Sequence, residues 1–408
     1  MVAGALVIVG LLAASVAAAW TSIDEADTDP VSVPDDDADR DATDDDTATS
    51  ESLPPASETD LQAAVDEISA MVERERGLNF TDPVEVELAG EGDFQQRLLE
   101  DFDEDVDELR QTEVLLKAFG LVGPDVDLVE SMRTLLGAGV VGFYDPETDE
   151  LVVRGTALTP YIRTTIAHEL THALDDQHFD LDRPEYDDAD DEVGFGFGAL
   201  VEGNARRVED AYVATLSDEE RLDAAAEELA LGGALDLGDV PLVLIRLISA
   251  PYGLGQSFVD TLIDEGGQSA LDAAFAAPPR TSEQVIEPAA YREGEARIEV
   301  PAPSAGGAVV DEGVAGQLLI ELVLADELGE DQAREAAEGW GGDWVVGWRD
   351  GERSCASLSV VGDDSGETTE LREAFEEWAT GRAGIDVTVD PDAGGGDPVT
   401  VRTCSPRQ

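Results

Sequence analysis

The spacing of apolar residues predicts a mainly helical chain from residue 58 onward. One apolar face at helical spacing predicts a helix over residues 58–76, and similar periodicity covers residues 94–119 and 126–136. Between the first two of these segments, residues 84–88 alternate valine or leucine with acids, which predicts a short half-buried strand. The first part of the folded region is therefore expected to place helices around a little β-structure.

A β-hairpin is predicted before a long helical region. Residues 140–144 and 151–154 have strand character and are joined by a turn rich in Asp and Pro. Thr159 and Pro160 then provide a helix N-cap and a proline in the first turn. From there to about residue 328 the chain is predicted to be helical, with loops at its Pro and Gly clusters.

The pattern changes after Trp340. Strands are predicted over residues 344–349, 355–361 and 399–403, and a helix over residues 369–379. We therefore expect an α+β protein, mainly helical, with a main domain over residues 58–335 and a small α+β segment over residues 336–408.

The first 57 residues carry export signals instead of a core. Residues 2–20 are nearly all apolar, long enough to span a bilayer, and end in a run of alanines that suits signal-peptidase cleavage. Residues 1–23 are thus a signal peptide or a membrane anchor, and both place the rest outside the cell. Residues 24–57 are Asp, Thr, Ser, Pro and Ala with few large apolar side chains, which predicts a disordered acidic linker.

The charge of the chain points to very salty surroundings. Against 93 acidic residues there are 24 basic ones, giving a formal charge of −69. An acidic surface of this kind repels itself in dilute buffer. Molar salt shortens the Debye length to roughly 3 Å and so screens most of that repulsion. We expect a solvated, halophilic surface. Nucleic acid is excluded as a partner because no basic patch is available to neutralise phosphates, and the sequence identifies no partner protein.

Two cysteines, Cys355 and Cys404, lie near the C-terminal end. Outside the cell a disulfide between them is expected, with two free thiols as the alternative. They do not form a zinc site by themselves, since two sulfurs without a nearby histidine fall short of four ligands.

The three histidines of the chain all lie between positions 168 and 178. His168 and His172 belong to the run His-Glu-Leu-Thr-His in the helix begun by Pro160. A spacing of four residues places both imidazoles on one helical face, where both can bind one metal ion. Glu169 lies beside the first histidine, in position to take a proton from a metal-activated water.

Two residues compete for the place of third ligand. His178 gives the spacing HExxHxxDxxH, which is similar to that of the metzincins. However, Asp175 stands where those enzymes have glycine, and no methionine follows the motif to form their methionine turn. Glu202 lies on a second expected helix, in Ala-Leu-Val-Glu-Gly-Asn-Ala, and is the preferred ligand. His178 would then lie behind the ligands or cap the helix.

With His168, Glu169, His172 and Glu202, the chain resembles the gluzincins, the zinc metallopeptidases with an HExxH…E arrangement to which thermolysin belongs. The run HELTHALDDQHFDL followed by ALVEGNA is more closely similar to haloarchaeal and actinobacterial surface metallopeptidases, and this likeness extends through residues 279–288 and 341–343. The resemblance implies a zincin-like fold, one zinc ion per chain, and a peptide or protein substrate cut by an endopeptidase. It also implies that the strand at residues 151–154 pairs with substrate along the cleft.

One position departs from the thermolysin pattern. Where that pattern has an acid to orient the first histidine, four residues after the ligand glutamate, this chain has Arg206. Asp175, Asp176 and Glu209 are the nearest acids by helical spacing that can replace it.

The resemblance implies hydrolysis with Glu169 as general base. Related enzymes stabilise the oxyanion with a downstream histidine and tyrosine, but no histidine follows His178, so Tyr252 and Arg206 or Arg207 remain as donors, with Tyr252 preferred. A serine or cysteine hydrolase with a histidine base is excluded because every histidine lies in one short segment. Two alternatives remain: a non-catalytic surface protein with a structural zinc site closed by His178, and an adhesion or stalk protein in which the motif is accidental.

Overall fold

The structure is a computed structural model, and it describes residues 54–102, 106–187, 191–234, 240–382, 387–389 and 397–407. The expected signal peptide or anchor, and the acidic linker up to residue 53, lie outside the described residues. The described part is an α+β protein in which helices predominate, which confirms the expected fold class at this level.

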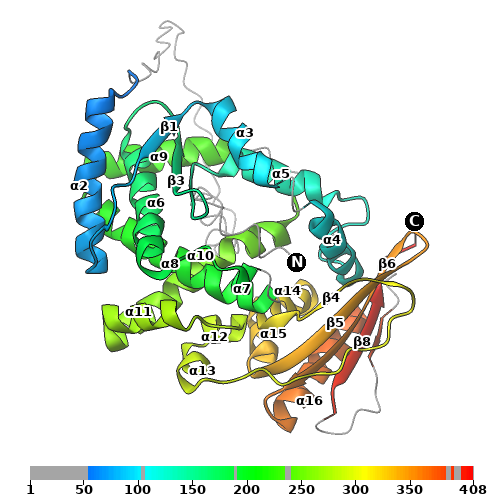
Figure 1. Ribbon diagram of the computed structural model, residues 1–408. Coiled ribbons are helices and arrows are strands. Elements are labelled where there is room, and N and C mark those ends of the chain that lie inside the picture. The colour runs from blue at the N-terminus through cyan, green and yellow to red at the C-terminus, as the bar shows by residue number, and fades with distance from the viewer. Residues whose placement is uncertain are drawn as a thin grey trace, which may run out of the picture.

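The described residues between 54 and 293 are mainly helical (Figure 1). In chain order the elements are α2 (Glu58–Arg76), β1 (Val86–Ala89), α3 (Glu91–Phe102), α4 (Val106–Phe119), α5 (Leu128–Gly139), β2 (Gly142–Asp145), β3 (Glu150–Arg154), α6 (Pro160–Phe179), α7 (Pro184–Asp187), α8 (Asp191–Thr215), α9 (Asp218–Ala234), α10 (Leu242–Gly266), α11 (Gln268–Ala276), α12 (Ser282–Ile286) and α13 (Pro288–Glu293). The predicted helix over residues 58–76 is confirmed in full, and it ends at Gly77, which has a left-handed φ of 67°.

A three-stranded sheet lies beside the motif helix. Its order is β1-β3-β2, with β1 parallel and β2 antiparallel to β3, so the predicted hairpin is confirmed. Because β3 is hydrogen-bonded on both sides, the expectation that residues 151–154 pair with a substrate strand is wrong. Of the hairpin, β2 is the strand at the edge of the sheet, and it packs against α6.

Helix α6 begins as predicted. The Thr159 side chain accepts a hydrogen bond from the backbone N–H of Ile162, and Pro160 occupies the first turn. The helix packs against α2, the sheet and α8, and its central residues from Thr164 to Asp175 are all buried. It thus forms the buried centre of this half of the molecule.

Helices α8 and α10 pack unusually closely. A Cβ atom added to Gly203 would lie 2.1 Å from the backbone carbonyl carbon of Gly255, so only glycine allows this approach. Among the described residues, α10 is the one helix long and apolar enough to cross a membrane. However, 44% of its most apolar stretch is buried inside the protein.

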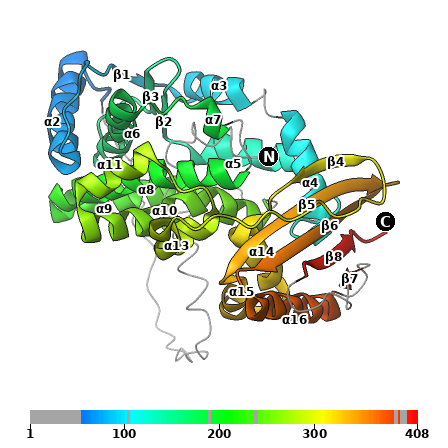
Figure 2. The ribbon, with the colours of Figure 1, turned by 60° about the horizontal axis from the view of Figure 1, so that its bottom comes forward.

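A second sheet occupies the other end of the molecule, where Figure 2 shows α16 along one of its faces. Its elements are β4 (Val309–Gly313), α14 (Gly316–Leu328), α15 (Glu330–Ala337), β5 (Trp340–Asp350), β6 (Arg353–Gly362), α16 (Ser365–Gly381), β7 (Thr388–Val389) and β8 (Val399–Cys404), with strand order β4-β5-β6-β8-β7. The predicted strands and helix after Trp340 are therefore confirmed.

This second sheet shares its core with earlier parts of the chain. Strand β4 pairs with β5, and the buried cluster around Trp340 and Trp378 also contains Leu115 and Phe119 of α4. The hydrophobic core thus crosses the boundary expected between residues 335 and 336.

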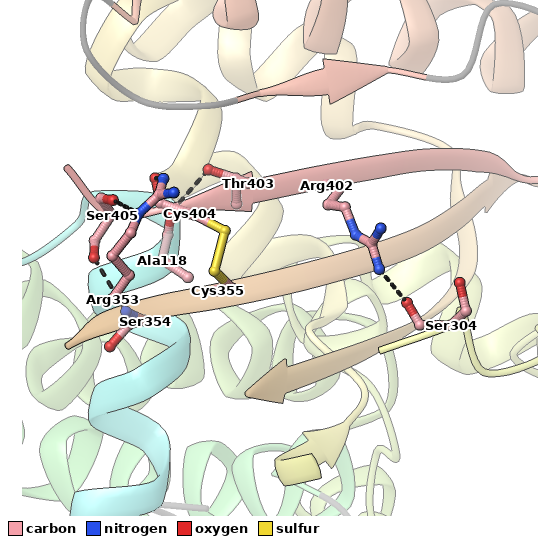
Figure 3. Close-up of a disulfide and its surroundings, with 9 residues drawn as sticks. All are labelled: Ala118, Ser304, Arg353, Ser354, Cys355, Arg402, Thr403, Cys404 and Ser405. Carbon is pink, nitrogen blue, oxygen red and sulfur yellow. Dashed lines mark hydrogen bonds between the residues drawn. A yellow bond between two sulfur atoms is a disulfide. The ribbon is translucent and has the colours of Figure 1, made fainter. Parts of the chain in front are cut away.

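The disulfide between Cys355 and Cys404 is formed and joins directly paired positions of β6 and β8 (Figure 3). Nearby, Thr403 donates a hydrogen bond of 2.9 Å to the carbonyl of Ala118 in α4. The expected disulfide is thereby observed, and it links the last strand to the centre of the sheet.

Residues 279–288 and 341–343 lie at the junction between the two halves. The hydroxyl of Ser282 donates to Glu192 at the start of α8 over 2.8 Å. Asp343 accepts hydrogen bonds from the backbone N–H groups of Ala315 and Gly316 where α14 begins, at 2.8 and 2.9 Å. Both segments therefore contribute packing and capping that fix α8 and α14.

Candidate metal centre

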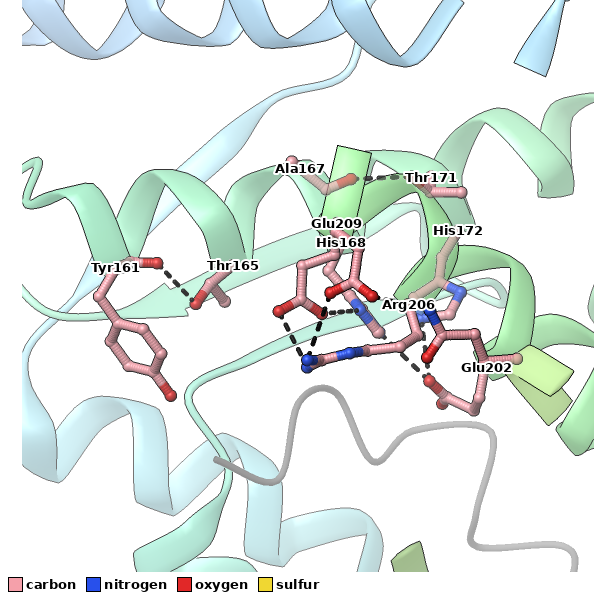
Figure 4. Close-up of polar contacts among 11 residues, drawn as sticks. Tyr161, Thr165, Ala167, His168, Thr171, His172, Glu202, Arg206 and Glu209 are labelled. Carbon is pink, nitrogen blue, oxygen red and sulfur yellow. Dashed lines mark hydrogen bonds and ion pairs between the residues drawn. The ribbon is translucent and has the colours of Figure 1, made fainter. Parts of the chain in front are cut away.

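Helices α6 and α8 bring the predicted ligands together. His168 and His172 lie one turn apart on α6, and Glu202 approaches them from α8. His168 is fully buried, while His172 and Glu202 are 5% and 3% exposed. Figure 4 shows the His168 imidazole between the carboxylates of Glu202 and Glu209.

The three side chains have the spacing of a metal-binding group. The carboxylate of Glu202 lies 3.2 Å from Nε2 of His168 and 3.6 Å from Nε2 of His172, and all three ligand atoms lie within 4.8 Å of one another. Atoms bound about 2.0 Å from a tetrahedral zinc ion lie about 3.3 Å apart. The two distances from Glu202 are close to this value, and two imidazoles with one carboxylate form a typical zinc donor set.

In the centre, His172 and Glu169 have buried polar atoms without hydrogen-bond partners. Both ring nitrogens of His172 and both carboxylate oxygens of Glu169 are buried and have no hydrogen-bond partner in the described part of the chain, although Nε2 of His172 lies 3.6 Å from the Glu202 carboxylate. Unpaired buried polar groups are costly, so each such atom in a folded protein needs an explanation. A metal ion bound to His172, with a water or substrate beside Glu169, would provide one.

Glu209 replaces the acid missing at position 206. Its carboxylate lies 3.1 Å from Nδ1 of His168 and also accepts a hydrogen bond of 3.1 Å from Arg206. A proton on Nδ1 that is donated to Glu209 leaves Nε2 free as the ligand atom. The chain therefore orients its first histidine from seven residues after Glu202, whereas the thermolysin pattern uses four.

The other two candidates for that role have different partners. Asp175 is buried and accepts hydrogen bonds from Arg76 at 2.7 Å and from Asn204 at 2.5 Å. Asp176 accepts a hydrogen bond of 2.7 Å from the hydroxyl of Tyr144 in β2. The first network ties α2 and α8 to α6 close to the ligands, and the second ties the edge strand to α6.

The centre is built to hold positive charge. Burial disfavours a charged His168, but hydrogen bonds to Glu202 and Glu209 outweigh it and raise the His168 pKa to about 10. Burial likewise opposes ionisation of Glu202, yet His172 and His168 lower its pKa overall. Carboxylates that stabilise an imidazolium in this way also stabilise a bound cation.

Glu169 differs from these acids. Burial raises the Glu169 pKa to about 7, although the nearby His168 and His172 lower it. A carboxyl group whose pKa lies near neutrality can accept and return a proton at working pH. Its position next to the ligands, with no partner of its own, suits a general base.

Tyr252 of α10 also reaches the centre. Its ring stacks on His168 with the centroids 6.2 Å apart, and its hydroxyl is hydrogen-bonded to Glu202. Burial and the carboxylates of Glu202 and Glu169 raise the pKa of Tyr252 well above its usual value, so the hydroxyl stays protonated as a donor. The structure thus brings together all five predicted site residues.

His178 lies outside this group. Its Nε2 donates a hydrogen bond of 2.8 Å to the backbone carbonyl of Asn79, in the segment after α2. In the described part of the chain, the metal-binding group consists of His168, His172 and Glu202. The preference for Glu202 over His178 agrees with this geometry.

Sequence reasoning missed two features of the centre. A Cβ atom added to Gly142 of β2 would lie 2.6 Å from Cγ2 of Thr165 and 3.0 Å from Oε1 of Glu169, so a glycine lets the edge strand approach this part of α6. Arg76, a fully buried arginine, contacts Asp175 from 99 residues away. In the sequence, Gly142 was visible only as a glycine inside a predicted strand. Arg76 was visible only as an arginine at the end of an amphipathic helix.

We compared the chain with known protein families, curated proteins and solved structures. No protein-family model, no curated protein and no solved structure matches the chain.

Proposed function

We propose that the chain is an exported zinc endopeptidase of the gluzincin type, with a zincin-like catalytic unit built on α6, α8 and the small sheet. The observation that carries the proposal is the buried His168, His172 and Glu202 group with the unpaired Glu169 carboxylate beside it. The acidic surface suits molar salt, and the Cys355–Cys404 disulfide suits an oxidising exterior.

The residues of the chain have separate parts in the proposed reaction. His168, His172 and Glu202 would hold a zinc ion, which would supply a Lewis acid and make water at the site more acidic. Glu169 takes a proton from the attacking water and passes it to the leaving amine. Tyr252 donates its hydroxyl proton in a hydrogen bond to the carbonyl oxygen as negative charge develops there. Glu209 keeps His168 in the tautomer that binds metal.

The edge strand β2 is the candidate for substrate alignment. It lies at the edge of its sheet, and Gly142 brings it against Glu169. An extended peptide that pairs with this edge would run past the general base. In this proposal β2 takes the place that the resemblance assigned to residues 151–154.

A structural zinc site is the alternative from another class. Structural sites have four protein ligands, whereas catalytic sites have three and keep an open position. His178, the residue expected to close a structural site, is bonded elsewhere, and no fourth ligand joins the group in the described part of the chain. This open position favours catalysis.

The test combines metal content with cleavage in molar KCl. We expect about one zinc per chain, and casein cleavage that stops with a chelator and returns with zinc. Glu202→Gln should weaken zinc binding, whereas His178→Ala, the matched control, should not. Stoichiometric zinc in His168→Ala, or zinc loss in His178→Ala alone, would contradict the assignment.

A further inference from the structure

The chain contains two asparagines, Asn79 and Asn204. Asn204 is fully buried and donates a hydrogen bond of 2.5 Å to the Asp175 carboxylate, so packing beside the metal centre accounts for it. Asn79 is exposed, in a chain that otherwise has 93 acidic residues for its polar surface. It begins the run Asn-Phe-Thr, which has the form of an N-glycosylation acceptor without proline at the middle position. The packing of the fold therefore explains Asn204 but not Asn79.

The acceptor run lies in the connection between α2 and β1. Leu78 and Phe80 are half-buried and pack against the core around α6. The residues that alternate with them, Asn79 and Thr81, are exposed. The acceptor pattern requires both an asparagine and a hydroxyl two residues later, so an enzyme that recognises it must reach both side chains. In this connection both are accessible from solvent.

Hydrogen bonds fix the run in this position. The backbone N–H of Thr81 donates to Gln177 over 2.8 Å, and the carbonyl of Asn79 accepts the hydrogen bond from His178. The Thr81 hydroxyl donates to Asp82 and Gln177 at the surface, where water or an enzyme can replace such contacts at little cost. The Asn79 side chain has no hydrogen-bond partner among the described residues. Its amide nitrogen is therefore available to an incoming group.

A group attached to Asn79 would lie away from the metal centre. His178, whose ring donates to the Asn79 carbonyl, comes six residues after His172 on α6. Six residues rise about 9 Å along a helix. Exposed connections are preferred sites of proteolytic nicking, and a bulky, hydrophilic sugar chain would cover this one. Such a modification protects the surface and leaves the ligands untouched.

We propose that Asn79 is N-glycosylated from a lipid-linked oligosaccharide after the chain crosses the membrane. The side-chain nitrogen of Asn79 attacks the anomeric carbon of the first sugar and forms a C–N bond. The bond between that carbon and the phosphate oxygen of the lipid carrier breaks, and the phosphorylated lipid leaves with the electron pair. The nitrogen loses one proton to solvent, so no oxidant or reductant takes part. The inference rests on export, which is part of the proposed function, and is independent of peptidase activity.

The experiment is peptide mapping of the protein exported by the organism that carries its gene. Trypsin releases residues 77–97, whose only asparagine is Asn79, and residues 164–206, which contain Asn204 and provide the internal control. Both peptides are analysed by mass spectrometry for the wild type, Asn79→Gln, Thr81→Ala and Thr81→Ser. The last variant is the matched control, since serine keeps the hydroxyl that alanine removes. Circular dichroism in molar KCl verifies that each variant is folded.

We expect most of the peptide over residues 77–97 to carry added sugar mass in the wild type and in Thr81→Ser, and none of it in Asn79→Gln and Thr81→Ala. The peptide over residues 164–206 should be unmodified in every sample. An unmodified Asn79 in the exported wild type, or sugar that remains in Thr81→Ala, would overturn the inference and leave the proposed peptidase standing.

Two other outcomes separate this inference from the proposed function. Wild-type protein that is found only inside the cell, with Asn79 unmodified, would refute export and the inference together. Exported, glycosylated protein that cleaves no peptide would support the inference and refute the peptidase alone.

Discussion

Replacing Glu209 by glutamine tests how the centre prepares its first ligand. The carboxylate is 4% exposed, lies 3.1 Å from Nδ1 of His168 and does not belong to the metal-binding group. Glutamine keeps the size of the side chain and an acceptor oxygen but removes the negative charge. The variant should therefore fold and still bind zinc, with a less basic and less firmly oriented His168.

The expected loss follows from the role of such partners. Loss of a hydrogen-bonding group behind a metal ligand weakens metal affinity by roughly 10- to 100-fold, which corresponds to about 1.4–2.7 kcal/mol. The burial of Glu209 places the effect toward the upper end, because solvent does not screen the charge. Removal of Glu202, a direct ligand, should cost more than this.

The assay is a zinc competition against a chelator of known affinity in molar KCl. Asp210→Asn is the matched control, since Asp210 also pairs with Arg206, at 3.3 Å, but is half exposed and lies one residue further along α8. We expect zinc affinity to be weaker in Glu209→Gln and unchanged in Asp210→Asn. Equal affinities in all three proteins, or equal losses in both variants, would refute the proposed orientation of His168.

Three further predictions concern stability. Arg76→Met should lower the free energy of unfolding by about 3–5 kcal/mol in denaturant titration, because it leaves the buried Asp175 carboxylate without its cation; an unchanged midpoint would contradict this. Burial, with nearby acids, raises the Glu283 pKa to about 8, so stability from a protonated Glu283 is present below about pH 4.5 and is lost as pH rises through 8; Glu283→Gln should raise the Tm at pH 8.5 but not at pH 4, and equal shifts at both pH values would refute it. Removing the Cys355–Cys404 disulfide, which closes a 49-residue separation, should cost about 4 kcal/mol by the chain-entropy estimate, measured by thermal unfolding of the double alanine variant.

Local signals made much of the centre readable from the sequence. Thr159 and Pro160 marked the start of α6, and the four-residue spacing of His168 and His172 set both on one face, as the structure has them. These features depend on residues within one or two helical turns of each other. Glu202 was predicted as a ligand because its segment has helical periodicity and because the HExxH…E arrangement resembles that of the gluzincins.

Long-range features were not readable in the same way. Residues 151–154 were predicted to pair with the substrate. However, β1, which lies more than 60 residues earlier in the sequence, pairs with the side of β3 that β2 leaves free. Strand β4 likewise joins a sheet formed by later residues. Arg76 and Asp175 have no shared local pattern, because a buried ion pair depends only on how α2 and α6 pack.

The Cys355–Cys404 pairing and the choice between Glu202 and His178 needed geometry. The spacing of the two cysteines was compatible with a disulfide and with two free thiols. The pairing of β6 with β8 decides between these alternatives. For the third ligand, His178 suited the HExxHxxDxxH spacing and Glu202 suited a position on a second helix, so the sequence pattern supported both. The position of His178 against Asn79 separates them, and it depends on the segment after α2.

The cleavage rate of Glu169→Gln, measured with zinc content in the same samples in molar KCl, tests the central proposal most directly. Glu169 is not a metal ligand, so the variant should keep its zinc and its fold while peptide cleavage falls by at least roughly 10²–10⁴-fold. Wild-type cleavage in the zinc-loaded variant would contradict the proposed role of Glu169 and, with it, the peptidase mechanism.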